Sequence, residues 1–251
     1  MIVYRKKFVR VAEGWHGEEP AAAGVDIVRR YQLAEPDPRA YCREFHTILI
    51  DLSADAGALF AAMKRGCRYE VRRAEAHDRL AYDFARADDA TLLARFREGY
   101  DEFARARRLR PLDPAWLALT AETGNLYVSR VCDERRGELV FHSYYLSGGR
   151  ATLLQSFSPQ RAAADAGRAR VSRANRLHHW LDVQKFKADG ATLYDLGGWY
   201  HGTTDPRRLA INRFKEGFGG AVVKNYIAER ALTPRGRLFL TARRLLLGDA
   251  I

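Results

Sequence analysis

The stretch FKEGFGG at residues 214–220 marks the end of a helix and the start of a strand. Apolar spacing predicts the helix over 209–218, and the glycine pair permits the positive φ with which helices often end. The apolar residues that follow predict a strand over 221–232. Upstream, YDLGGW at 194–199 contains a predicted strand over 192–196 that runs into a second glycine pair. Two glycine pairs thus frame one helix between two strands.

Working outward, the chain mixes helical and strand patterns throughout. Helices are expected over 56–64, after the caps Asp88 or Asp89, after Asp113-Pro114, from a Ser172 cap to Gly190, and over 235–247. Strands are expected over 45–52, 126–131, 138–146 and 151–158, the last two joined by a glycine turn. This order predicts an α/β (α+β) fold in which helices flank a mixed sheet.

Composition narrows the class of protein. The chain has 251 residues, of which 47% are hydrophobic, enough for one large domain or two small ones. It has no long apolar run and no secretory leader pattern, so a cytoplasmic protein without a membrane span is expected. Cys42, Cys67 and Cys132 are dispersed, which suits reduced thiols, and no zinc-type spacing occurs. We therefore expect no metal site.

The charge balance is strongly basic. Lys and Arg number 42 against 31 Asp and Glu, a net charge of +11. Such a surface attracts the phosphates of nucleic acids, nucleotides or anionic lipids, or is simply a solvated basic surface. Two arginine clusters stand out, one at Arg65, Arg68, Arg72 and Arg73 and the other at Arg161, Arg168, Arg170 and Arg173. Guanidinium groups can bind phosphate oxygens in pairs, so each cluster is a candidate phosphate site.

Three motifs in order carry a resemblance to a known family. RYEVRRAE at 68–75, YDLGGW at 194–199 and FKEGFGG at 214–220, with the helix over 176–189 between the first two, resemble the Fem-type peptidoglycan-bridge transferases over residues 48–231. The resemblance implies a GNAT-like fold and transfer of an amino acid from aminoacyl-tRNA to an amine, without a cofactor. Family members are longer, with two GNAT-like subdomains. It therefore implies a truncated N-terminal subdomain at 1–85 and a catalytic subdomain at 86–251.

The resemblance also implies roles for individual residues. It places Phe214 and Lys215 beside the reacting ester, where a cation stabilises the oxyanion of the tetrahedral intermediate. The alternative is an exposed helix lysine with Phe214 in the core. Asp195 either accepts a proton from the incoming ammonium or caps the glycine turn. Expected substrate-binding residues are Gly197, Gly198, Trp199, Tyr200, Arg68, Arg72 and Arg73, and expected tRNA- or phosphate-binding residues are Arg161, Arg168, Arg170 and Arg173.

Two other functions remain open from the sequence. One is a coenzyme A-dependent N-acyltransferase on an amino sugar or polysaccharide precursor, although RAAADA at 161–166 lacks the glycines that bind a pyrophosphate. The other is a non-catalytic nucleic-acid-binding module. The acceptor of the leading function is an amine, which a nucleotide- or lipid-linked precursor can carry. The basic amphipathic helix over 235–247 either packs on the core or gives weak peripheral membrane association. His178 and His179 lie on a predicted helix without a third ligand at useful spacing, so they are not expected to bind a metal. His142 and His201, near strands, are expected to be buried and hydrogen-bonded.

Overall fold

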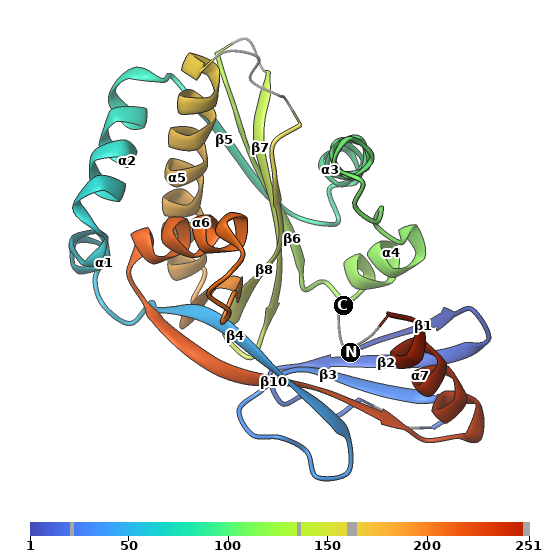
Figure 1. Ribbon diagram of the computed structural model, residues 1–251. Helices are drawn as coiled ribbons and strands as arrows, with labels where there is room; N and C mark the ends of the chain where they lie inside the picture. The colour runs from blue at the N-terminus through green and yellow to red at the C-terminus, as the bar shows by residue number, and fades with distance from the viewer. Residues whose placement is uncertain (21–22, 135–136, 160–164, 248–251) are drawn as a thin grey trace. The chain divides into compact units, whose positions relative to one another are not determined.

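A computed structural model describes residues 1–20, 23–134, 137–159 and 165–247 (Figure 1). The chain forms two compact units, each described here by itself. The first contains Met1–His46, Pro114–Thr123 and Lys224–Ile251, and the second contains Thr47–Asp113 and Gly124–Val223. Each unit is therefore made of segments that alternate along the chain. The boundary at residue 85 between two GNAT-like subdomains stays a prediction.

The second unit is built on a mixed sheet. Its strand order is β4-β9-β8-β7-β6-β5. Neighbours from β5 to β8 run antiparallel and β8 pairs with β9 in parallel. The strands are β4 (Tyr41–Asp51), which begins in the first unit, β5 (Ala81–Arg86), β6 (Leu126–Cys132), β7 (Glu138–Ser147), β8 (Arg150–Phe157) and β9 (Leu193–Trp199).

Helices pack on both faces of this sheet (Figure 1). α1 (Ala56–Ala62), α2 (Arg65–His77) and α5 (Asp165–Ala188) lie against one face. There Trp180 and Phe186 of α5 are buried against Tyr194 of β9. α3 (Ala90–Arg107) covers the other face, where Phe96 packs on Phe157 with a centroid distance of 5.4 Å. Burying each such side chain stabilises the folded state by about 2–3 kcal/mol, so the helices on both faces stabilise the sheet.

The segment after β9 brings the FKEGFGG stretch back toward the sheet. α6 (Pro206–Lys215) is capped by Asp205, whose carboxylate accepts hydrogen bonds from the Arg207 and Arg208 amides. A 3-10 turn, η1 (Glu216–Phe218), follows and leads into β10 (Ala221–Ala231). Phe218 is fully buried in the same core as α5, which anchors the end of α6.

The first unit contains further strands and a polar centre. β1 (Ile2–Lys6), β2 (Val9–Trp15), β3 (Ile27–Leu33) and the latter part of β10 lie in that order, with α4 (Pro114–Glu122) and α7 (Pro234–Leu247). Arg29 is buried and pairs with Glu13 at 2.8 Å and with Glu229 at 2.7 Å. Arg243 of α7 also donates to Glu229. These ion pairs join β2, β3, β10 and α7 in one buried polar cluster.

Some predicted elements need correction. The helix predicted from a Ser172 cap begins at Asp165, because Val171 and Ala174 pack on β6 and β7 and keep the chain helical before Ser172. The strands β1, β2, β3 and β5 were not predicted. β2 is buried at nearly every position, so it lacks the alternation by which strands are recognised. Among the described residues, no helix is long and apolar enough to cross a membrane.

Candidate active site

The second and third motifs meet at one cavity of the second unit. This active-site cavity has a volume of about 520 Å³ and lies among β8, β9, α5 and α6. Gly197 and Gly198 line it together with Phe214 and Lys215. Its other lining residues are Leu153, Leu154, Ser156, Asn175, His179, Leu196, Ala210 and Ile211. The fold thus brings the glycine pair of YDLGG to the Phe-Lys pair, as the resemblance implies.

Lys215 is held at the glycine turn. Its Nζ donates a hydrogen bond to the Gly198 carbonyl oxygen at 2.6 Å. Burial lowers the pKa of Lys215 to about 8, while the Asp195 carboxylate acts in the opposite direction. The cation therefore still predominates at neutral pH. An ammonium has three protons, and Gly198 is its sole hydrogen-bond partner among the described residues, so two protons remain for a ligand.

Gly197 is required for this close approach. Its φ is +71°, a value that side-chain-bearing residues rarely adopt. A Cβ atom there would also lie 2.9 Å from the Leu153 carbonyl oxygen of β8 and 3.9 Å from Lys215 Nζ. The glycine therefore lets β9 turn tightly against β8 beside the lysine.

Asp195 is fully buried and holds the turn. Its Oδ1 accepts the Gly197 amide at 2.8 Å, and its Oδ2 accepts Arg150 Nη2 at 2.7 Å. The Thr47 hydroxyl also donates to this carboxylate. Asp195 is absent from the described lining of the active-site cavity. Of the two roles open from the sequence, these contacts favour turn capping over proton acceptance from a substrate.

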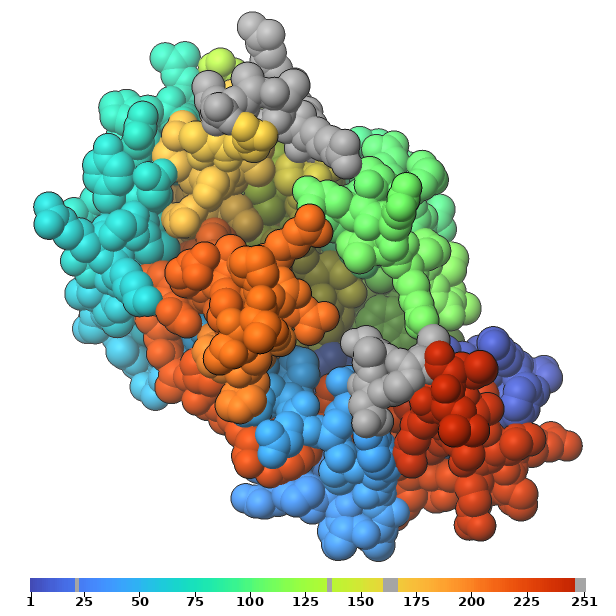
Figure 2. Space-filling view, viewed as in Figure 1, coloured from blue at the N-terminus to red at the C-terminus, as the bar shows by residue number. Residues whose placement is uncertain are grey.

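Phe214 lies between aromatic and cationic neighbours. Its ring is 5.3 Å from that of Phe218 and 5.8 Å from that of His179, and the Arg176 guanidinium lies 4.9 Å over it. Phe214 also borders a second cavity of about 940 Å³, together with Ser156 and Asn175. Both cavities share these three residues and are therefore neighbours. Figure 2 shows the surface hollowed between α6, in orange, and the green residues of α3.

Trp199 ends β9 and Tyr200 follows it, and both lie outside the described lining of the active-site cavity. Trp199 is half-buried and packs against the main core. The Tyr200 amide donates to Asn212 Oδ1 at 2.9 Å, and the Arg208 guanidinium lies 5.3 Å over the Tyr200 ring. Their substrate-binding role stays a prediction.

Of the arginines predicted to bind substrate, one makes hydrogen bonds within the protein and two are exposed. Arg68 donates to the Ala61 carbonyl oxygen at 2.6 Å and also to that of Met63, so it closes the end of α1. Arg72 and Arg73 are exposed on α2. Together with Arg173 they line a groove of about 520 Å³, here called the arginine groove.

The second predicted cluster is partly internal. Arg173 makes a bidentate pair with Asp78, with both N–O distances at 2.9 Å, and Arg170 donates to the Asp78 carbonyl oxygen. Arg168 lines the 940 Å³ cavity. Arg161 lies outside the described residues. The fold therefore brings Arg173 of one cluster to Arg72 and Arg73 of the other.

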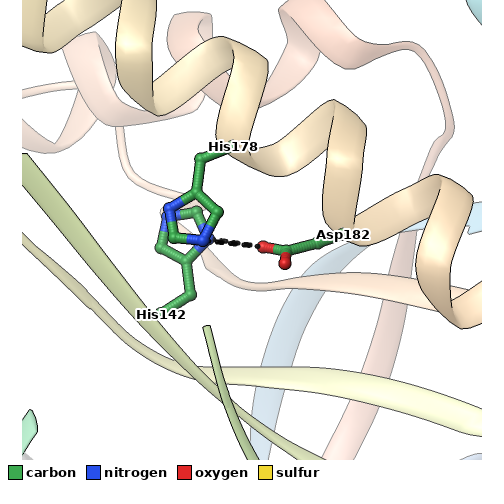
Figure 3. Close-up of side chains that lie close together, drawn as sticks. All are labelled: His142, His178 and Asp182. Carbon is green, nitrogen blue, oxygen red and sulfur yellow. Dashed lines mark hydrogen bonds and ion pairs between the residues drawn. The ribbon is translucent and has the colours of Figure 1, made fainter. Parts of the chain in front are cut away.

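A buried polar network beside the cavity was missed by sequence reasoning. His142 of β7 and His178 of α5 stack with their ring centroids 3.8 Å apart, and Asp182 lies at their edge (Figure 3). His142 Nδ1 is 2.7 Å from Asp182 Oδ2. One signal existed: His178 and Asp182 are four residues apart on a helix, and so share a face.

This cluster could also be taken for a metal site. Its three candidate ligand atoms, from His142, His178 and Asp182, lie within 4.8 Å of one another. However, Asp182 already accepts hydrogen bonds from Tyr82 at 2.8 Å and from Tyr144 at 2.6 Å. A metal ion would have to displace several of these bonds. The residues fit a hydrogen-bond network better than a metal centre.

Comparison with known proteins gives structural likeness alone. No protein-family model matches the chain, and no curated protein sequence matches it either. FemX matches with a TM-score of 0.60 and 12% identity, over 81% of this chain and 64% of the FemX chain. The C-terminal domain of a putative lysylphosphatidylglycerol synthetase from Agrobacterium fabrum matches with a TM-score of 0.56 and 17% identity, over 91% and 75%. L-PGS from Bacillus licheniformis gives 0.51 and 13%, over 87% and 72%.

At these identities the likeness establishes the fold. The predicted mixed sheet flanked by helices is confirmed, and its fold is similar to that of FemX. The chain spans 64% of the FemX chain, which is less than two thirds of its length.

Proposed function

We propose that this protein is an aminoacyltransferase that moves an amino acid from aminoacyl-tRNA to an amine. The observation that carries the proposal is the Lys215 ammonium, held by the Gly198 carbonyl at the edge of a cavity that the Phe-Lys and Gly-Gly motifs line together. A surface lysine with no function would need neither partial burial nor a glycine with positive φ beside it.

The chemistry follows from the charge of Lys215. Attack of an amine on the ester carbonyl creates an oxyanion, which a fixed cation stabilises more than it stabilises the neutral ester. One such donor lowers the barrier by about 3 kcal/mol. Phe214 lines the cavity, with the Arg176 guanidinium over its ring, and an aromatic ring there suits the sugar or base next to the ester.

The donor is proposed from charge and from the family resemblance. The arginine groove offers Arg72 and Arg73 to phosphates, and the net charge of +11 favours a polyanion such as tRNA. The name of the Agrobacterium neighbour, a lysylphosphatidylglycerol synthetase, describes an aminoacylated lipid. A cell-envelope or other small precursor, nucleotide- or lipid-linked, is the acceptor class that we propose. No separate cofactor takes part in this scheme.

A donor screen tests the proposal. Purified protein is incubated with a charged tRNA pool or with acetyl-coenzyme A, and with a panel of diamines, amino sugars and lysine-containing peptides. Mass spectrometry should detect an amide product with the charged tRNA pool. Low-micromolar binding of coenzyme A in calorimetry, with no retention of tRNA at physiological salt, would contradict the proposal and favour a coenzyme A-dependent N-acyltransferase. Retention of tRNA without any transfer would favour a binding module.

A further inference from the structure

A chain of hydrogen bonds leads from the active-site cavity into the core. His179 lines the cavity, and its Nδ1 lies 2.7 Å from the Tyr194 hydroxyl oxygen. That oxygen is 2.6 Å from the Tyr144 hydroxyl, which donates to Asp182 Oδ2 at 2.6 Å. All four side chains are at most 2% exposed. A carboxylate in the core is thus connected to an imidazole at the cavity through two tyrosines.

The direction of each bond fixes the tautomer of His179. The Asp182 carboxylate only accepts, and the Tyr144 hydroxyl donates to it, so the contact of 3.0 Å between the Tyr144 oxygen and His142 Nδ1 is one in which Tyr144 accepts. Tyr194 must then donate to Tyr144, since Tyr144 has a single hydroxyl proton. The Tyr194 oxygen is therefore left to accept a hydrogen bond from His179 Nδ1–H. Neutral imidazole carries one proton, so Nε2 of His179 holds a lone pair.

The second nitrogen of His179 is available to a substrate. Within the described part of the chain, Tyr194 is the sole hydrogen-bond partner of the His179 ring. The ring borders the cavity that Lys215 also lines, and it contacts Phe214 with centroids 5.8 Å apart. An unprotonated ring nitrogen and a cation that can bind an oxyanion, in the same cavity, suit amide formation from an amine.

We propose that His179 is the catalytic base of the transfer, with Tyr194, Tyr144 and Asp182 as positioning residues that fix its tautomer and stabilise its protonated form. This inference rests on the proposed aminoacyl transfer. The step balances without any further reactant. The amine nitrogen bonds to the acyl carbon while one N–H proton moves to His179 Nε2. The acyl C–O bond then breaks, and the imidazolium returns that proton to the departing ribose oxygen.

The groups around His179 keep its imidazole unprotonated. Burial lowers the pKa of His179 well below its ordinary value, and His142, Lys215 and Arg176 act in the same direction. These groups face it from β7, α6 and its own helix, and Tyr194 faces it from β9. The imidazole is thus neutral at pH 7. Its transient positive charge is stabilised through the tyrosines by the Asp182 carboxylate.

The tautomer can be measured without any substrate. Nitrogen-15 NMR of the full chain at pH 7, assigned with the His179→Gln variant, should show a protonated Nδ1 and an unprotonated Nε2 for His179. Tyr194→Phe removes the acceptor of the Nδ1 proton and should shift the population toward the other tautomer. The matched control is Tyr145→Phe, which alters the next buried tyrosine of β7, on the opposite sheet face from Tyr144. Its spectrum should match that of the wild type.

Kinetics test the base role itself, with charged tRNA and the amine acceptor found in the donor screen. His179→Gln should lower kcat by about 10²- to 10³-fold with little change in KM, the usual scale for loss of a general base. Tyr194→Phe, which keeps the ring packing, should lower kcat by about tenfold through the loss of one hydrogen bond. It should also move the acid limb of the kcat profile to lower pH, because the imidazolium loses a stabilising acceptor.

The outcomes separate the inference from the proposed function. An Nε2-protonated tautomer in the wild type, or a folded His179→Gln variant with kcat near that of the wild type, overturns the base role while transfer itself stands. If His179→Gln does not fold, Tyr194→Phe decides instead. A Tyr194→Phe variant whose kcat and whose acid limb of the kcat–pH profile both match the wild type overturns the base role as well. A wild type that transfers nothing overturns the proposed function, and with it the base role.

Discussion

At the scale of single residues, Lys215 carries the largest expected effect. Lys215→Met keeps the length of the side chain but removes the ammonium, so the fold should persist. We expect turnover to fall by about 10²- to 10³-fold, the scale of losing one oxyanion donor. The matched control is Lys185→Met, which removes a helix lysine that pairs with Asp189 on the surface. Near-normal turnover in Lys215→Met, with the same melting temperature, would return Lys215 to the role of a structural lysine.

The pH dependence of Lys215 gives an independent prediction. Because burial lowers its pKa to about 8, the active cation is present below that pH and is lost as the pH rises through it. Transfer to an acceptor whose amine is already neutral should therefore decline above pH 8. Lys215→Arg keeps the charge at every working pH, since the guanidinium does not deprotonate. An alkaline decline of equal position in wild type and Lys215→Arg would assign it to another group.

The sequence predicts some of these residues and not others, for a physical reason. Lys215 and Gly197 stand in short motifs whose spacing is local, and the fold brings them together as expected. The contacts that Asp195 and Arg68 make could not be predicted, because their partners are distant in sequence or are backbone carbonyls. The role proposed for His179 could not be predicted, since it depends on a chain of hydrogen-bond partners that sequence spacing does not reveal.

At the scale of elements, helices and strands could be predicted where capping residues, glycines or apolar spacing mark them locally. The strand expected over 221–232 is β10, and the helix expected over 235–247 is α7. α6 begins three residues before the predicted start, because Asp205 caps the helix and Pro206 occupies its first position, the same pattern as Asp113-Pro114. The arginine stretch 65–73 is helical within α2, and it becomes a groove only through packing on α5.

The helix α7 supports a prediction about membranes. Phe239 and Leu240 are buried, whereas Leu238, Leu245 and Leu246 are exposed by 64%, 82% and 81%. We expect weak, salt-sensitive sedimentation with anionic vesicles, because exposed leucines can insert while each nearby cation adds about 1 kcal/mol. Replacing the three exposed leucines with serine should abolish it without unfolding the protein. Full-length protein that ignores such vesicles at low salt would show that α7 has no membrane role.

At the scale of the whole molecule, the polar centre of the first unit predicts how stability depends on pH. Burial acts to raise the pKa of Glu229, but the hydrogen bond from Arg243 and the charge of Arg29 outweigh it and lower that pKa to about 2. Folding therefore favours the ionised carboxylate. Its contribution, on the order of 3 kcal/mol, is fully present above the ordinary pKa of 4.5 and is lost as the pH falls toward 2.

Glu229→Gln tests this argument because it removes the charge and keeps the shape. At pH 7 the variant leaves Arg243 without its buried carboxylate, so urea unfolding should show a loss of about 3 kcal/mol. Between pH 4.5 and pH 2 the wild type should lose stability more steeply than the variant, since only the wild type takes up the Glu229 proton on unfolding. The two stability curves should thus converge toward pH 2. Parallel curves over that range would mean that another carboxylate controls the acid sensitivity of the fold.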